Sequence, residues 1–195
     1  VSRCQVVPFR HIPATEAAGI IRQNTGASLD LARIAIEACG GSITRACEFL
    51  KSNERLDFRR RVVDALARLD HADDWDIVGM AADLVSAAKA PLDDVRAKLE
   101  AEIAENADFL AKSAIRQIEA RNKRQITAKT LQSLHQLFCI AESWLRDVAA
   151  VCSGAPELVI NVDVRAQIEA AAARTDEAKA AAALMRVRVS DEAIS

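Results

Sequence analysis

The amino-acid composition predicts an all-α protein. Of the 195 residues, 51% are apolar, but only 4% are aromatic and none is tyrosine. Alanine, leucine, arginine and glutamate, which are strong helix formers, are frequent, and the chain has only six glycines and four prolines. Apolar residues also recur at spacings of three and four, the pattern of helices packed on other helices. We therefore expect helices joined by short turns.

The first twelve residues are the part that is not expected to be helical. The segment 1–9 alternates enough to form a strand or an extended stretch, and Pro13 can begin the first helix. A single strand is not stable by itself, so we expect residues 1–12 to be the remnant of a larger core. The sequence also opens in mid-motif, from which we expect a fragment of a longer chain whose N-terminal part is missing.

Three short helices are predicted next, over about 14–24, 29–39 and 43–52. Glycine turns separate these helices, and serines stand where N-caps are needed. The turns are Gly26 and Gly40-Gly41, and the caps are Ser28 and Ser42. We assign these helices to a small domain over 13–52, with its own core.

Longer helices follow in a second predicted domain over 53–195. Pro91 is expected to open the longest helix, and a break is expected around 122–125. Long helices with short turns between them predict an antiparallel bundle. The expected helices are 53–69, 75–89, one from Pro91 to the break, 126–152, 157–174 and 177–187.

The sequence holds little that predicts chemistry of its own. It has no G-x-x-x-x-G-K-[ST] phosphate-binding loop, and its three histidines, His11, His71 and His135, lie on unrelated segments. We expect these histidines to be surface or half-buried helix residues. Hence no intrinsic activity and no cofactor or metal are predicted for this chain.

The five cysteines show no C-x-x-C pair, and none was expected to stand beside a histidine at a zinc-ligand spacing. They are predicted to be buried thiols of a cytoplasmic protein. These residues are Cys4, Cys39, Cys47, Cys139 and Cys152. No apolar run approaches a membrane span, and a net charge of −2 gives no general attraction to nucleic acid or membrane.

One arginine-rich stretch has two interpretations. Arg55 and the run Arg59-Arg60-Arg61 could form a nucleic-acid patch. Consecutive helical residues point in different directions, however, and Glu54, Asp57 and Asp64 lie close enough to pair with them. A solvated, ion-paired face is the better prediction.

The start of the chain carries the most specific motif. Ser2-Arg3-Cys4 is followed by an extended segment, by Pro13 and then by Gly40-Gly41-Ser42. This order resembles the clamp-loader branch of the AAA+ ATPases, in which a Ser-Arg-Cys motif ends the nucleotide-binding core and a helical lid comes next. The resemblance implies that Arg3 acts as an arginine finger in trans, flanked by Ser2 and Cys4, on ATP held by a neighbouring subunit.

The turn also indicates which kind of clamp-loader subunit the chain resembles. ATP-hydrolysing relatives carry an arginine two residues after the serine, where this chain has Thr44 and places Arg45 one residue later. That offset rotates the side chain by about 100°. The pattern is similar to the δ′ subunits of bacterial DNA polymerase III. Two later segments, Trp144-Leu145-Arg146-Asp147 and Ile160-Asn161-Val162-Asp163, resemble the δ′ C-terminal domain.

The resemblance implies a lid domain followed by a helical collar that assembles with γ/τ and δ subunits. Such a complex loads the sliding clamp on primed DNA during replication, as part of the DNA polymerase III holoenzyme. The chain itself is expected to reach DNA and clamp only through that complex, and not to bind membrane. The alternatives are a γ/τ ATPase subunit of the same clamp loader and a stand-alone helical scaffold.

Overall fold

The computed structural model describes residues 12–106 and 112–194, and within these ranges the chain is helical and contains no strand. The all-α prediction is confirmed. The expected strand-like segment 1–9 lies outside the described residues. None of the described helices has an apolar stretch long enough to cross a membrane.

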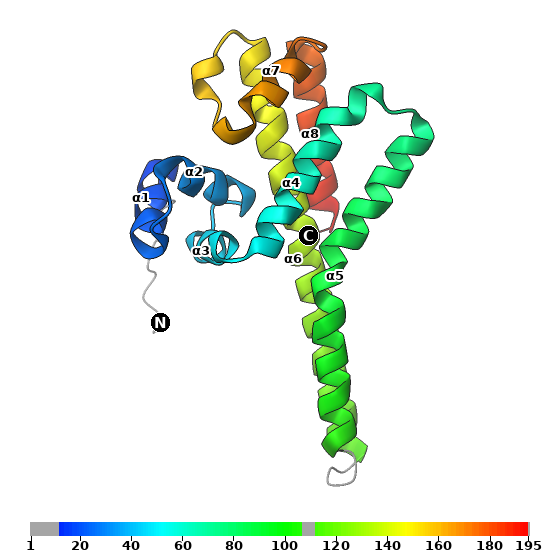
Figure 1. Ribbon diagram of the computed structural model, residues 1–195. Helices are drawn as coiled ribbons and strands as arrows, with labels where there is room; N and C mark the ends of the chain where they lie inside the picture. The colour runs from blue at the N-terminus through cyan, green and yellow to red at the C-terminus, as the bar shows by residue number, and fades with distance from the viewer. Residues whose placement is uncertain (1–11, 107–111, 195) are drawn as a thin grey trace, which may run out of the picture.

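The three short helices form as the glycines and serines predict. They are α1 (Ala14–Thr25), α2 (Leu29–Ala38) and α3 (Ile43–Lys51), grouped at one side of the molecule in Figure 1. Gly26 ends α1 with a φ of 73°, in the left-handed region that glycine adopts without strain. The hydroxyls of Ser28 and Ser42 accept hydrogen bonds from the N–H groups of Leu31 and Arg45, so both predicted N-caps are confirmed.

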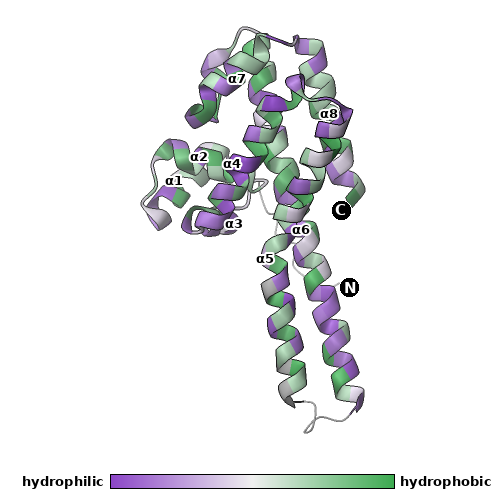
Figure 2. Ribbon diagram, turned by 45° about the vertical axis from the view of Figure 1, so that its right-hand side comes forward, coloured by the Kyte–Doolittle hydropathy of each residue, from purple (hydrophilic) through white to green (hydrophobic). Residues whose placement is uncertain are grey.

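A single residue links the last of the short helices to the next helix. Ser52 ends α3 and caps α4 (Asn53–Arg68), because its hydroxyl accepts from the Arg55 N–H at 3.3 Å. A 3₁₀ turn (Leu69–His71) then leads to two long helices, α5 (Asp74–Asn106) and α6 (Lys112–Cys152). Figures 1 and 2 show the end of α5 and the start of α6 projecting from the body as a two-helix arm.

Two predicted breaks are wrong, because α5 runs through Pro91 and α6 runs through Asn122. Ala88 and Leu92 beside the proline are buried, and this packing keeps the helix together although the proline cannot donate a backbone hydrogen bond. Asn122 is buried in a cleft that it shares with Leu99 and Ile103 of α5. Packing between the arm helices thus outweighs the local breaking signals.

The segment after α6 is less regular than predicted. The single helix expected over 157–174 is replaced by 3₁₀ turns at Pro156–Leu158 and Val162–Val164 and by the short α7 (Arg165–Ala172). The last helix, α8 (Glu177–Ile194), is longer than predicted and packs along α6. In Figure 1, α8 descends beside the ascending end of α6.

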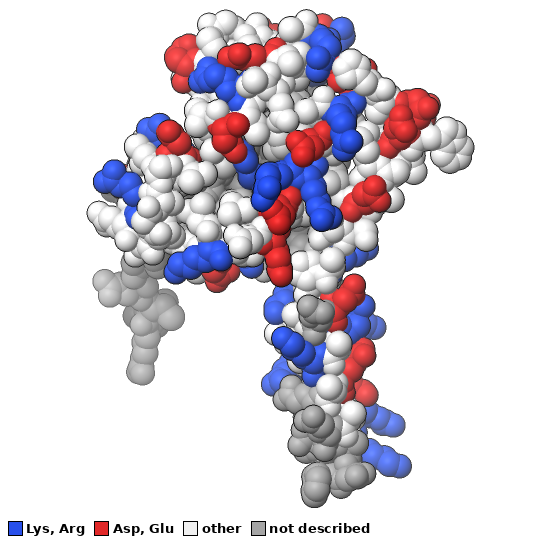
Figure 3. Space-filling view, in the orientation of Figure 1, with Lys and Arg blue, Asp and Glu red and all other residues white. Residues whose placement is uncertain are grey.

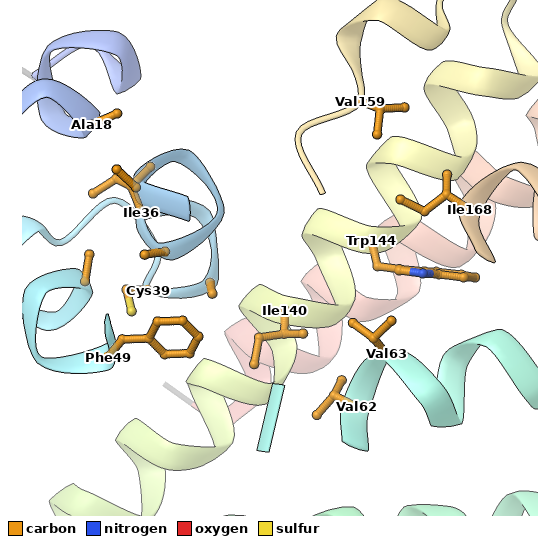
Figure 4. Packing of buried hydrophobic residues seen from close by; sticks show 14 of the residues in the cluster. Ala18, Ile36, Cys39, Phe49, Val62, Val63, Ile140, Trp144, Val159 and Ile168 are labelled. Carbon is orange, nitrogen blue, oxygen red and sulfur yellow. The ribbon is translucent and has the colours of Figure 1, made fainter. Parts of the chain in front are cut away.

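The expectation of separate cores for the two predicted domains is wrong, because the buried side chains form one continuous cluster. Figure 4 shows Phe49 of α3, Val62 of α4 and Ile140 of α6 facing a shared interior, with Trp144 one turn further along α6. Trp144 is 4% exposed, so it is a core residue of the bundle. The cores merge because α6 packs against both α2 and α4.

Pro91 gives a direct test of the continuous helix. Replacing a proline inside a helix restores one backbone hydrogen bond and removes a steric clash. We expect Pro91→Ala to raise the free energy of unfolding by up to about 3 kcal/mol, measured by urea denaturation followed by circular dichroism. Lys89→Ala, an exposed change two residues earlier, serves as the control. No gain, or a loss, for Pro91→Ala would show that the helix breaks at Pro91.

Candidate functional site

The predicted arginine finger, Arg3, and its neighbours Ser2 and Cys4 lie outside the described residues. The glycine turn that accompanies them in the sequence is described. Gly40 and Gly41 have φ values of 58° and 79°, and the Gly41 N–H donates to the Ile36 carbonyl at 2.9 Å. The turn therefore closes α2 in a conformation that favours glycine at both positions.

The residues after this turn have different surroundings. Thr44 is exposed on α3, whereas Arg45 is half-buried and lines a small cleft with Arg55, Cys39 and His135. The one-residue offset between Thr44 and Arg45 thus carries the guanidinium toward α6, while the position that an ATPase subunit would fill with arginine faces solvent.

The most elaborate polar arrangement is centred on Asp147, whose carboxylate is completely buried (0% exposed). Its Oδ2 accepts hydrogen bonds from the backbone N–H groups of Ile160 and Asn161, at 3.1 and 2.7 Å. The Asn161 side-chain amide donates to the same oxygen at 2.7 Å, and Arg146 donates to Oδ1 at 2.9 Å. These donors compensate for removing the charge from water.

Asn161 connects Asp147 to helix α4. Its Oδ1 accepts from Arg59 Nη2 at 2.7 Å, and Arg59 also donates to both carboxylate oxygens of Asp163, at 2.7 and 3.0 Å. Arg59 is 5% exposed, so its ion pair with Asp163 is bidentate and its guanidinium is shielded from solvent. It joins the middle of α4 to the irregular segment after α6.

Arg146 extends the network to the short helices. Its Nη1 donates to the Glu37 carboxylate of α2 at 2.9 Å, while its other nitrogens contact Asp147. We call the connected set the joint, because it ties α2, α4 and the 160–163 segment to α6. Its members are Glu37, Arg59, Ser143, Arg146, Asp147, Asn161 and Asp163.

The interpretation of the arginine-rich stretch as a solvated face is wrong for Arg59. Arg60 does pair with Asp57, as predicted, whereas Arg55 contacts Glu48 at 3.6 Å. A signal for burial was present, because Val62 and Val63 lie three and four residues after Arg59 on the same helical face. An arginine on an apolar face indicates a buried pairing partner, but the sequence does not show that the partner is more than 100 residues away.

A second cluster lies where α6 meets α8. Both carboxylate oxygens of Asp191 lie 2.8 Å from His135 Nδ1, and His135 Nε2 lies 3.5 Å from Cys139 Sγ. The expectation that no cysteine stands beside a histidine at a zinc-ligand spacing is wrong for Cys139, since a spacing of four residues on a helix brings both side chains to one face. Gly40 packs against this pair, because a Cβ there would lie 3.1 Å from His135 Nε2.

The thiols in this region are not suited to nucleophilic catalysis. Burial raises the pKa of Cys139 to about 12, with the nearby carboxylates of Asp191 and Glu142 acting in the same direction. Burial also raises the pKa of Cys39 to about 11. Both are thiols at neutral pH, whereas an activated nucleophile has a lowered pKa. Among the described residues, no group of three or more His, Cys, Asp or Glu side chains is arranged to hold a metal ion.

No protein-family model, curated protein or solved structure matches this chain. The geometry itself distinguishes a structural site from a chemical one. In the joint, the carboxylates and guanidinium groups form hydrogen bonds to one another. In the second cluster, the Cys139 thiol is protonated at neutral pH. The described residues thus provide a rigid connection between helices.

Asp147→Ala tests the joint. The change removes the acceptor for two backbone N–H groups and one of the acceptors of each of the Asn161 and Arg146 side chains. We expect a loss of about 3–5 kcal/mol in the free energy of unfolding, the range for breaking a buried charged pair, measured by urea denaturation.

Asp93→Ala is the matched control, because Asp93 forms an exposed ion pair with Arg96 on α5. Its expected effect is within about 0.5 kcal/mol. Equal losses for the two variants would mean that the Asp147 network contributes no more than a surface pair.

The cysteine environment predicts slow alkylation. With the raised pKa values, fewer than about one in 100 of the Cys39 and Cys139 thiols is ionised at pH 8. We expect iodoacetamide to label these two residues in urea but hardly in the folded protein, as measured by peptide mass spectrometry.

The same pKa values predict how the free energy of unfolding changes with pH. The folded state favours the protonated thiols, so their contribution is complete below pH 9, the ordinary thiol value, and is lost as the pH rises toward 11–12. Rapid labelling of both residues in the folded protein at pH 8 contradicts this assignment.

Proposed function

We propose that the chain is the lid and collar part of a δ′-type subunit of a bacterial clamp loader, which assembles with γ/τ and δ subunits to load the sliding clamp on primed DNA. The supporting order is three short helices with a Gly-Gly-Ser turn, followed by a bundle of longer helices. The N-terminal motif Ser2-Arg3-Cys4 precedes them in the sequence.

One observation carries most of the proposal. The two later segments that resemble δ′, 144–147 and 160–163, are separated by about a dozen residues and share the buried hydrogen bonds of Asp147. Arg146 of the first segment binds α2, and Asp163 of the second binds α4. The residues behind the resemblance therefore connect α2 and α4 to α6 and to the segment that follows it.

A fixed connection suits a subunit that acts on its neighbour's nucleotide. An arginine finger stabilises the charge on the transferred phosphoryl group only when its guanidinium is held in place. In the proposed subunit, the bundle contacts the other collars and the joint holds the lid on the bundle. Assembly of the ring then determines where the adjoining core, with Arg3, can lie.

The glycine turn favours a stator over an ATPase. In the proposed role, the subunit does not bind ATP productively, and Thr44 stands where γ/τ subunits carry arginine. Arg45 instead lines the cleft beside His135. The γ/τ assignment and the stand-alone scaffold remain the competing functions, and the experiments below separate the three.

Co-purification is the primary test. The chain, tagged and expressed together with γ/τ and δ subunits of the same organism, is expected to elute with both in one gel-filtration peak. Failure to bind either subunit would leave the helical scaffold as the function. Micromolar ATP binding by the complete subunit, together with ATP hydrolysis, would favour γ/τ.

Arg3 tests the trans-acting role. Arg3→Ala in the complete subunit is expected to leave assembly intact and to lower the DNA- and clamp-stimulated ATPase of the reconstituted complex. Arginine fingers contribute about 10³–10⁵ in rate at their own site, and the total falls less because only one γ/τ site is affected. Arg3→Lys is expected not to restore the rate, because an ammonium lacks the planar fork.

Arg121→Ala provides the control, because Arg121 is an exposed arginine on the arm. It is expected to leave both assembly and ATP hydrolysis unchanged. If Arg3→Ala and Arg121→Ala complexes hydrolyse ATP equally fast, Arg3 is not a finger, even if co-purification succeeds.

A further inference from the structure

The first three turns of α5 expose an unusual amount of apolar surface. Trp75 is 84% exposed and Val78 is 63% exposed, and Ile77 and Val85 are exposed as well. Trp75, Val78 and Val85 follow one another at helical spacings, so they share one face of α5. Single exposed apolar residues are ordinary, whereas a stripe led by a tryptophan is typical of an interaction surface.

This stripe is held rigidly at its start. The Asp73 carboxylate accepts from the Asp76 N–H at 2.8 Å, and the Asp76 carboxylate accepts from the Asp73 N–H at 3.3 Å. This reciprocal pair caps the N-terminus of α5 in the manner of a capping box. Trp75 therefore stands on a defined helical turn directly after the cap.

Among the described residues, the hydrophobic core cluster does not include Trp75, Val78 or Val85. Along α5, the contact with the core cluster begins at Leu84, and the buried positions are Ala88 and Leu92. In Figure 1 the start of α5 lies at the outer edge of the molecule, away from α6 and α8. The apolar face is thus available to another molecule.

The charged residues of the segment that carries the stripe are all acidic. Residues 69–88 contain five aspartates and neither lysine nor arginine. Asp70 is paired with Arg174, whereas Asp74 is exposed and lies one helical turn before Val78, on the same face of α5 as the stripe. In Figure 3 this outer edge shows white and red atoms. An acidic border disfavours anionic lipid and nucleic acid and favours a cationic partner.

We propose that the stripe formed by Trp75, Val78 and Val85 is a docking site for a helix of a partner protein that carries apolar residues flanked by lysine or arginine. The apolar face of such a helix covers the tryptophan and valines, and a basic residue at its edge meets Asp74. This inference names a surface and a partner chemistry that the proposed clamp-loader function does not specify.

A pair of synthetic peptides tests the proposal. Both are amphipathic helices of about 18 residues with the same leucine stripe, one with lysine and the other with glutamate on the polar face. The lysine peptide is expected to bind the protein at least about tenfold more tightly than the glutamate peptide, measured by fluorescence anisotropy, and to weaken as salt is raised. The emission of the exposed Trp75 is expected to shift to the blue on binding, while that of buried Trp144 stays constant.

Variants place the binding on this surface. Trp75→Ala and Asp74→Lys are each expected to weaken the binding of the lysine peptide about tenfold or more. Leu158→Ala, a similarly exposed change on the turn after α6, is expected to leave binding unchanged. Unchanged circular dichroism and melting confirm that the variants fold, as expected for exposed positions.

Several outcomes would overturn the proposal. These are equal binding of the two peptides, an equal effect of Trp75→Ala and Leu158→Ala, Trp75-dependent dimers in analytical ultracentrifugation, and Trp75-dependent binding to neutral phosphatidylcholine vesicles. The assay uses the protein without clamp-loader subunits, so its failure leaves the co-purification result standing. Likewise, failed co-purification leaves a positive peptide result standing.

Discussion

Asp147 has no contact with solvent, and a carboxylate in that position must receive hydrogen bonds from the protein or its burial opposes folding. Its donors come from its own helix and from the chain thirteen and fourteen residues further on. Satisfying this charge therefore fixes the path of the chain after α6. The same requirement explains why residues 156–164 form short 3₁₀ turns in place of the regular helix that their sequence suggests, since the N–H groups of 160 and 161 bind the carboxylate.

The remaining connections follow from that path. Asp147 holds the Asn161 side chain so that its amide oxygen, Oδ1, faces α4 and accepts a hydrogen bond from Arg59. The Asp163 carboxylate also accepts from Arg59. On the other side, Arg146 bridges Asp147 and Glu37 of α2. Buried polar networks of this kind specify one arrangement of helices, because any other would leave charges without partners. The apolar cluster provides the bulk of the burial, and the joint selects how the short helices sit on the bundle.

Helix α8 is attached to α6 by a separate set of contacts. His135 Nδ1 lies 2.8 Å from the Asp191 carboxylate, and Glu142 accepts from Arg188 at 2.7 Å, so two polar contacts one to two turns apart align the helices. The arm and the start of α5 lie outside both arrangements. The molecule thus combines a rigid centre, where polar groups are saturated, with an outer helix whose apolar stripe remains open.

The sequence by itself determined the helical class, the three short helices and their caps. Gly26, Ser28 and Ser42 act through backbone groups within a few residues, so local chemistry is sufficient to place them. The role of Arg3 stays a prediction, because it depends on a resemblance and lies outside the described residues.

Only the tertiary structure decided the continuity of α5 and α6, the single core and the joint. Pro91 and Asn122 are breaking signals whose cost is small beside the packing of two long helices, and that packing is invisible to a local pattern. Arg59 and Asp163, or His135 and Asp191, are separated by dozens of residues, and charge alone does not say which pairs meet. The exposure of Trp75 is of the same kind. The sequence shows an apolar turn, but whether the protein covers it depends on where every other helix lies.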